Sequence, residues 1–250
     1  MPAPSGFSAT PPPRPRRRWA HWIIATIVIG LILFFIGQVG YFMWQFRYGD
    51  SQQVAKIQAE FRSNEWSGNK NGEGPKPPTA LEPYIKAYNP TLGKATAPVT
   101  IVAFIDFECP FCRRSQPIFD QMLEKYGPAV RVVYKALPLA SLHPNAFAAA
   151  EAAACAQDQG KFWEYYQLLF KNQALDDAGL TAAAQALTLD QAKFTHCLQT
   201  HPHQATIEAD IDDAIALGVR GTPTYFVKHA VIEGVADAAR WDQVIISQLR

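Results

Sequence analysis

The feature that most constrains the fold of this chain is a buried strand that ends at a pair of cysteines. Residues 99–107, Val-Thr-Ile-Val-Ala-Phe-Ile-Asp-Phe, form a nearly continuous apolar and β-branched run. Such a run is typical of a strand that is covered on both faces. A Cys-Pro-Phe-Cys motif at 109–112 follows and opens a helix, which is predicted to continue over 117–126. A second buried run at 130–136 gives the order strand, helix, parallel strand.

The remainder of the C-terminal region predicts more helices and a final hairpin. Consecutive helical segments follow one another from residue 144 to residue 217, and two short strands are expected at 224–227 and 230–234. A closing helix is predicted at 238–249. The fold class is therefore α/β, with a core that is interrupted by a helical insertion at about 144–217. We assign residues 88–250 to this domain.

An apolar segment near the N-terminus predicts a membrane anchor. Residues 19–46 contain no Lys, Arg, Asp or Glu. As a helix they would extend about 42 Å, more than the roughly 30 Å of hydrocarbon in a bilayer. The alternative is a cleaved signal peptide, whose apolar core is shorter and ends in small residues. The long run and its exit through Tyr41 and Trp44 favour one uncleaved transmembrane helix.

The segments that flank this helix set the expected topology. Residues 1–18 carry four arginines and no acidic residue, and their Pro-rich composition predicts a disordered cytoplasmic stub. The domain then lies outside the cytoplasm, at the cell surface or in a periplasm. Residues 47–87 are expected to form a short helical stalk and a flexible linker. Residues 90–250 hold 13 Lys and Arg against 17 Asp and Glu, which argues against binding to nucleic acid.

The two cysteines of the motif have the context that redox chemistry requires. Cys109 stands at the N-terminus of a helix, where free N–H groups and the helix dipole favour its thiolate. Cys112, one turn later, can reach Cys109 and resolve a mixed disulfide. Half of a zinc site and an inert bridge are the alternatives. Zinc would require a second pair at similar spacing, but Cys155 and Cys197 are 42 residues apart.

A Thr222-Pro223 dipeptide immediately before the predicted strand at 224–227 is a second candidate element of the site. By the local sequence alone, a trans proline that caps the strand is the simpler interpretation. A cis Pro223 would instead turn the chain so that the Thr222 backbone is exposed to an extended peptide.

Taken together, the motifs of this region resemble the DsbA-like branch of the thioredoxin superfamily. The resemblance covers about residues 88–250 and rests on Pro90–Gly93, Ala97–Thr100, Cys109–Cys112, His143-Pro144, Cys155-Ala156, Gly160–Tyr166, Phe194–Leu198 and Gly221–Thr224. It implies a thioredoxin fold with an inserted helical domain, a cis Pro223 beside the dithiol, and thiol–disulfide exchange on proteins outside the cytoplasm.

The resemblance also assigns roles to individual residues. Cys109 and Cys112 become the catalytic pair. The expected substrate-binding residues are Pro110, Phe111, Thr222 and Pro223. Cys155 and Cys197 occupy positions where similar proteins often have a second, structural disulfide.

The sequence departs from the family in two places. Many relatives carry an acidic residue six positions before the first cysteine, and this chain has Ala103 there. Asp106 and Glu108 are the candidates to replace it. The dipeptide Pro110-Phe111 also lacks the histidine of the most oxidising relatives, which removes one cation beside the thiolate.

No metal and no cofactor are predicted. His196, His201 and His203 cluster around Cys197, but their spacing fits a solvated junction between helices.

The function expected from the sequence is that of a membrane-tethered thiol–disulfide oxidoreductase. It would act mainly as an oxidase on secreted or membrane proteins that contain cysteines. A quinone-linked membrane protein of the DsbB or VKOR kind would re-oxidise it. The alternatives are a reductase or isomerase for a particular client, and a tethered peptide-binding or chaperone module.

Overall fold

The computed structural model describes residues 74–250, together with Gly30, Phe34, Gly37 and Gln38, which are helical. The predicted stub, most of the predicted transmembrane helix and the first part of the predicted linker lie outside the described residues. Among the residues that are described, no helix combines the length and the apolar character needed to cross a bilayer.

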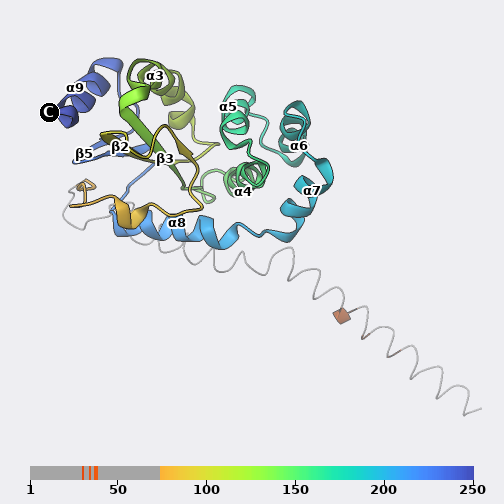
Figure 1. The fold of residues 1–250 in the computed structure, drawn as a ribbon. Helices are drawn as coiled ribbons and strands as arrows, with labels where there is room; N and C mark the ends of the chain where they lie inside the picture. The colour runs from red at the N-terminus through yellow and green to blue at the C-terminus, as the bar shows by residue number, and fades with distance from the viewer. Residues whose placement is uncertain (1–29, 31–33, 35–36, 39–73) are drawn as a thin grey trace, which may run out of the picture. The chain divides into compact units, whose positions relative to one another are not determined.

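A five-stranded mixed sheet forms the centre of the domain (Figure 1). Its strands are β1 (Thr91–Leu92), β2 (Val99–Ile105), β3 (Val130–Ala136), β4 (Thr224–Val227) and β5 (Ala230–Glu233), and their order is β1-β3-β2-β4-β5. Strands β2 and β3 are parallel, and the other neighbours are antiparallel. The predicted order of strand, helix and parallel strand is therefore confirmed.

Strand β2 ends two residues earlier than the sequence predicted. The carboxylate of Asp106 accepts a hydrogen bond from the backbone N–H of Glu108 (2.8 Å), which turns the chain out of the sheet. Helix α3 (Pro110–Tyr126) begins directly after this turn. A short 3-10 helix, η2 (Gly127–Ala129), then leads into β3. The turn at Asp106 thus sets where the helix that carries the cysteine motif begins.

Helices cover both faces of the sheet. Figure 1 shows α3 and α9 (Ala238–Leu249) on one side and α8 (Gln204–Ala216) on the other. Because side chains alternate along β4, Tyr225 faces the first side, where its ring contacts Phe119 of α3 and Trp241 of α9. The next residue, Phe226, has the opposite orientation. The mixed α/β layers predicted from the sequence are confirmed.

Five helices separate β3 from β4 in the chain. They are α4 (Ala146–Gln157), α5 (Phe162–Asn172), α6 (Asp177–Ala186), α7 (Gln191–Thr200) and α8. Helix α6 begins four residues before the predicted Thr181, because the carboxylate of Asp176 caps its N-terminus by accepting from Gly179 N–H. In Figure 1, α4 to α7 lie together beside the sheet. Their aromatic side chains join the core through Phe107, whose ring contacts Tyr166 and Phe170.

The segment that precedes β1 packs on the domain. It contains a short 3-10 helix, η1 (Glu82–Tyr84), and the side chain of Leu81 is 5% exposed. The carbonyl oxygen of Tyr84 accepts a hydrogen bond from the Lys135 ammonium at 2.9 Å. The folded part of the chain therefore includes residues from Leu81 onward. A flexible linker stays a prediction for the residues before position 74.

Candidate active site

Strand β2 and helix α3 place the two cysteines of the motif at the junction between sheet and helix. Cys109 is the N-cap of α3, and its backbone φ and ψ are extended. Cys112 lies one turn into the helix. Both are free thiols, and their exposed fractions are 3% and 2%. The arrangement follows from the sequence, because a buried strand that stops at Asp106 leaves Cys109 where the first N–H groups of α3 have no helical partner.

The surroundings of Cys109 stabilise its ionised form. A hydrogen bond from the Cys112 thiol is the largest contribution, followed by one from the Thr222 side chain and by the backbone N–H groups of Cys112 and Phe111. Together they outweigh burial and lower the pKa of Cys109 from 9.0 to about 6. At neutral pH this cysteine is therefore a thiolate when the pair is reduced.

The surroundings of Cys112 have the opposite effect. Burial raises the pKa of the Cys112 thiol well above its ordinary value, and the neighbouring Cys109 raises it further. The two sulfurs of the motif are thus chemically different. Cys109 is a nucleophile and a good leaving group, and Cys112 holds its proton.

The loop before β4 brings Thr222 to the cysteines across more than a hundred residues of chain. Cys109 Sγ lies 3.3 Å from the carbonyl oxygen of Thr222, to which it donates when it is protonated. The hydroxyl of Thr222 is buried and lies near both sulfurs, so it can donate to a Cys109 thiolate. The Thr222-Pro223 peptide bond is cis. The structure thus brings together the two motifs that the sequence analysis singled out.

The dipeptide between the cysteines faces the solvent. Pro110 is exposed, and the ring of Phe111 is 50% exposed. The guanidinium of Arg114 lies 5.1 Å from the centroid of this ring. An apolar ring held at the mouth of the site can contact a bound peptide.

Asp106 and Glu108, the candidates to replace the family's acidic residue, both contact a neighbouring loop. Asp106 is 1% exposed, and its Oδ2 accepts from Leu139 N–H and contacts His143 Nδ1 at 2.7 Å. Glu108 accepts from the backbone and side-chain nitrogens of Asn145. The segment from β3 to α4 is therefore fastened beside the cysteine motif. In the sequence, His143 stood out only as part of a family motif, and its contact with Asp106 was not predicted.

A buried ion cluster lies on the α8 side of the sheet, and sequence reasoning also missed it. The Lys135 ammonium of β3 is fully buried and contacts the carboxylates of Asp210 (2.8 Å) and Asp213 (2.6 Å) of α8. Asp210 also accepts hydrogen bonds from Asn89 and from the backbone N–H of Ala136. A lysine inside an apolar strand was the only sequence signal for this cluster. Its partners, 75 and 78 positions later in the chain, have no local pattern.

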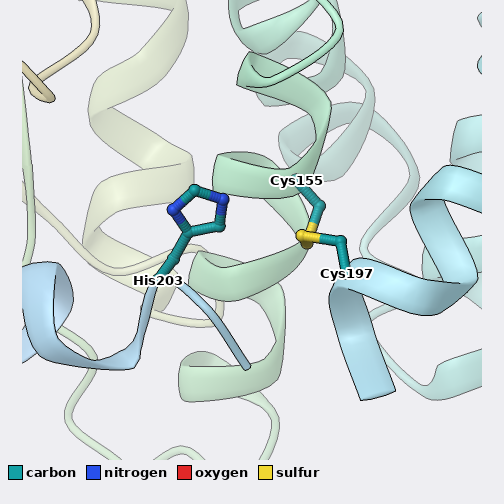
Figure 2. Close-up of side chains that lie close together, drawn as sticks. All are labelled: Cys155, Cys197 and His203. Atoms are coloured by element: carbon teal, nitrogen blue, oxygen red, sulfur yellow. A yellow bond between two sulfur atoms is a disulfide. The ribbon is translucent and has the colours of Figure 1, made fainter. Parts of the chain in front are cut away.

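The second pair of cysteines lies within the helical insertion. A disulfide joins Cys155 of α4 to Cys197 of α7. Of the three histidines noted in the sequence, His201 contacts Glu151 and His203 contacts Asp158, each at 2.7 Å. His203 also lies close to the disulfide, as Figure 2 shows. This pair therefore has a different environment from Cys109 and Cys112.

Comparisons with known proteins agree with this geometry. A family model described as thioredoxin matches residues 86–246. The chain is 43% identical over 136 residues to a Na(+)/H(+) antiporter, NhaA 3 of Salinispora tropica; the match covers 54% of this chain and 21% of the antiporter. The chain thus spans about a fifth of the length of this curated relative.

Two solved structures show the same fold. A thioredoxin-like oxidoreductase from Silicibacter pomeroyi DSS-3 superposes with a TM-score of 0.60 at 27% identity, covering 65% of this chain and 92% of that one. BdbD from Bacillus subtilis, in its oxidised form, superposes with a TM-score of 0.60 at 23% identity, covering 70% and 97%. This chain belongs to the thioredoxin family, and its fold is that of the thioredoxin-like thiol–disulfide oxidoreductases.

Proposed function

We propose that this chain is a thiol–disulfide oxidoreductase in which Cys109 and Cys112 are the catalytic residues. The observation that carries the proposal is the difference between the two sulfurs. The pKa of Cys109 is lowered to about 6, and that of Cys112 is raised well above its ordinary value. A pair with one stable thiolate and one protonated thiol is suited to forming and resolving mixed disulfides.

In the oxidase direction, the reaction starts with Cys109 and Cys112 joined as a disulfide. A client thiolate attacks the sulfur of Cys109, the bond to Cys112 breaks, and Cys112 leaves as a thiolate that takes up a proton. A second client thiolate then attacks the client sulfur of the mixed disulfide, and Cys109 leaves as a thiolate. Two electrons pass from the client to the protein, and the client gains a disulfide.

The low pKa of Cys109 supports the oxidase direction. A stabilised Cys109 thiolate favours the reduced form of the pair, which makes its disulfide the more oxidising partner. The reductase or isomerase alternative runs the same steps in reverse, with Cys109 as the attacking thiolate and Cys112 as the resolving thiol. The tethered chaperone alternative would not use the thiols.

The proposed substrates are proteins with accessible cysteines. The exposed ring of Phe111 and the backbone of Thr222, whose carbonyl oxygen lies 3.3 Å from Cys109 Sγ, offer an apolar contact and a peptide-binding edge next to the reactive sulfur. Pro110, which is exposed, and Pro223, which is buried directly after Thr222, are the other two residues expected to bind substrate.

We place the domain outside the cytoplasm, tethered by a transmembrane helix at residues 19–46. The support is the uncharged apolar run, the arginines before it and the Cys155–Cys197 disulfide, which is stable in an oxidising compartment. A quinone-linked membrane protein would then re-oxidise the Cys109 and Cys112 pair after each turnover.

The test is the reduction potential of the Cys109 and Cys112 pair, measured against glutathione buffers with the full chain in detergent. We expect a potential closer to the roughly −120 mV of DsbA than to the roughly −270 mV of thioredoxin. A value near that of thioredoxin would favour the reductase. Failure to oxidise a reduced client and to reduce an oxidised one would favour the chaperone.

A further inference from the structure

Side chains of types that bind metal ions lie beside the Cys155–Cys197 disulfide, and Figure 2 shows one of them, His203. The group lies where α4, α7 and α8 meet, and the proposed thiol exchange does not use it. Cys155 comes from the last turn of α4, Cys197 from α7, and His203 from the N-cap of α8. The two sulfurs and a ring nitrogen of His203 all lie within 4.8 Å of one another.

Asp158 supplies a fourth donor at the same place. It is the C-cap of α4, three residues after Cys155. Its Oδ2 lies 2.7 Å from His203 Nε2 and 3.8 Å from Cys197 Sγ. The ligand atoms of a tetrahedral zinc site stand about 3.3 to 3.8 Å apart, given bonds of about 2.3 Å to sulfur and about 2.0 to 2.2 Å to nitrogen or oxygen. Cys155, Cys197 and His203 already form a compact group. Once the S–S bond is broken, a rotation of the Asp158 side chain, which now contacts only His203 and Cys197 of this group, would complete a set of four donors.

The electrostatic surroundings favour a cation. Glu151 lies one turn before Cys155 on α4 and is 4% exposed. Its Oε2 contacts His201, and its Oε1 is buried without a partner among the described residues. Helix α4 thus carries one carboxylate, Glu151, one turn before Cys155, and ends at another, Asp158. The side chains of Asp158 and His203 are 53% and 22% exposed, so an ion can enter from the solvent between them.

We propose that the reduced form of this site binds one Zn²⁺ ion through Cys155, Cys197, His203 and Asp158. The disulfide and the zinc ion then exclude each other, because both use the same two sulfurs. Two thiolates with one imidazole and one carboxylate suit zinc, whereas calcium and magnesium prefer oxygen ligands alone. The histidines near Cys197 were interpreted in the sequence as a solvated junction between helices, because the four ligands come from three helices without a second closely spaced cysteine pair.

The redox steps of this proposal balance. A dithiol reductant gives two electrons and two protons to the Cys155–Cys197 bond and itself becomes a disulfide. Zinc then displaces the two thiol protons. In the reverse direction, a protein disulfide takes two electrons from the two thiolates and two protons from water and becomes a dithiol, the Cys155–Cys197 bond forms, and Zn²⁺ is released.

The consequence is that zinc would hold the insertion together when the disulfide is absent. The ion would link α4, α7 and α8 at the point where the disulfide links α4 and α7. A chain whose second pair of cysteines has not yet been oxidised would then still have an ordered insertion, because metal binding contributes directly to folding.

The experiment uses the full chain in detergent with Cys109→Ser and Cys112→Ser, so that only the second pair remains. The protein is reduced with a phosphine, freed of reductant and titrated with Co²⁺ and then with Zn²⁺. We expect one equivalent of Co²⁺ with thiolate charge-transfer absorption, displaced by one equivalent of Zn²⁺. The same protein with its disulfide intact should bind neither ion.

Single variants in this background identify the remaining ligands. His203→Ala and Asp158→Asn should each weaken zinc binding by on the order of tenfold to a hundredfold. His196→Ala is the matched control, since His196 is exposed one position before Cys197, and it should leave the affinity unchanged. Equal affinity in the His203 and His196 variants would overturn the site, as would zinc binding by the oxidised protein.

If reduction unfolds the insertion, circular dichroism measures the helix content of the reduced protein with and without zinc. Recovery of helix content on addition of one equivalent of Zn²⁺ would support the proposal, since a metal that binds the folded site refolds it. A reduced protein that is folded but binds no zinc, or one that stays unfolded in its presence, would contradict it. Neither outcome bears on the proposed activity of Cys109 and Cys112.

Discussion

The chain holds two pairs of cysteines in two environments. The contrast explains why one pair is suited to thiol–disulfide exchange and the other to a disulfide that stabilises the fold. Cys109 and Cys112 share one helix N-terminus, three positions apart, where N–H groups and the Thr222 hydroxyl face a sulfur. Cys155 and Cys197 join two helices 42 positions apart in the sequence.

The pair at the helix N-terminus has one stabilised thiolate, so its disulfide is readily attacked and released. The pair between helices closes a long loop, so its disulfide removes conformations from the unfolded chain. The local surroundings of the sulfur, and not the residue type, decide between these two roles.

The largest effect is expected from breaking the first pair. Cys109→Ser should abolish thiol–disulfide exchange, because no other thiolate is positioned beside Thr222. Cys112→Ser should instead accumulate mixed disulfides through Cys109, since the resolving thiol is gone. Non-reducing electrophoresis after incubation with an oxidised client measures both. A Cys112→Ser protein that forms no adduct would reverse the assigned roles.

Breaking the second pair should change stability and spare the chemistry. Replacing Cys155 and Cys197 by Ala removes a loop constraint of roughly 40 residues, which the chain-entropy model values at about 4 kcal/mol. Urea denaturation of the oxidised protein in the absence of metal measures the loss. The rate of exchange at Cys109 should stay close to that of the parent protein. A folded double variant without exchange activity would make the second pair part of the catalytic machinery.

A somewhat smaller effect should appear as a pH dependence of the reduced protein. The pKa of Cys109 is about 6 in the folded state, below its ordinary value of 9.0, so its ionisation stabilises the fold as pH rises above 6. The contribution is fully present above the unfolded pKa and is lost as pH falls through 6. Between pH 6 and pH 8 it amounts to about 2 kcal/mol, because the full slope of about 1.36 kcal/mol per pH unit is reached only above pH 7.

Denaturation curves at several pH values test this dependence. Cys109→Ser, measured in the same reduced state, is the control and should lack the increase from pH 6 to pH 8. The oxidised protein should lack it as well, because a disulfide does not titrate. An equal increase in the serine variant would assign the pH dependence to other groups.

The two regions also differ in how far the sequence alone predicted them. The motif at 109–112 was placed correctly between a strand and a helix, because apolar runs and helix starts are local patterns. The boundary at Ile105 and the early start of α6 depended on Asp106 and Asp176, whose side chains accept nearby backbone N–H groups. Such turns follow from single hydrogen bonds, which hydrophobic periodicity does not register.

The contacts that the sequence did not predict join residues far apart in the chain. Asp106 meets His143 across the loop after β3, and Lys135 meets Asp210 between a strand and a helix of the insertion. Each contact has at least one fully buried partner, Asp106 in the first and Lys135 in the second, and each joins elements that only the tertiary fold brings together. The charge count of the domain does not say which of these side chains pair, and only the tertiary structure shows the partners.

The smallest effect is expected from the Thr222 hydroxyl beside the reactive sulfur of Cys109. Thr222→Val keeps the backbone carbonyl that lies 3.3 Å from Cys109 Sγ and removes the hydroxyl that stabilises the thiolate. Because a hydrogen bond to a charged group contributes about 1.5 kcal/mol or more, the pKa of Cys109 should rise by about one unit. The pH dependence of alkylation of the reduced protein by iodoacetamide reports this pKa, and Thr222→Ser should restore the parent value. An unchanged pKa in the valine variant would leave the Cys112 thiol and the N–H groups at the start of α3 as the whole source of the thiolate's stability.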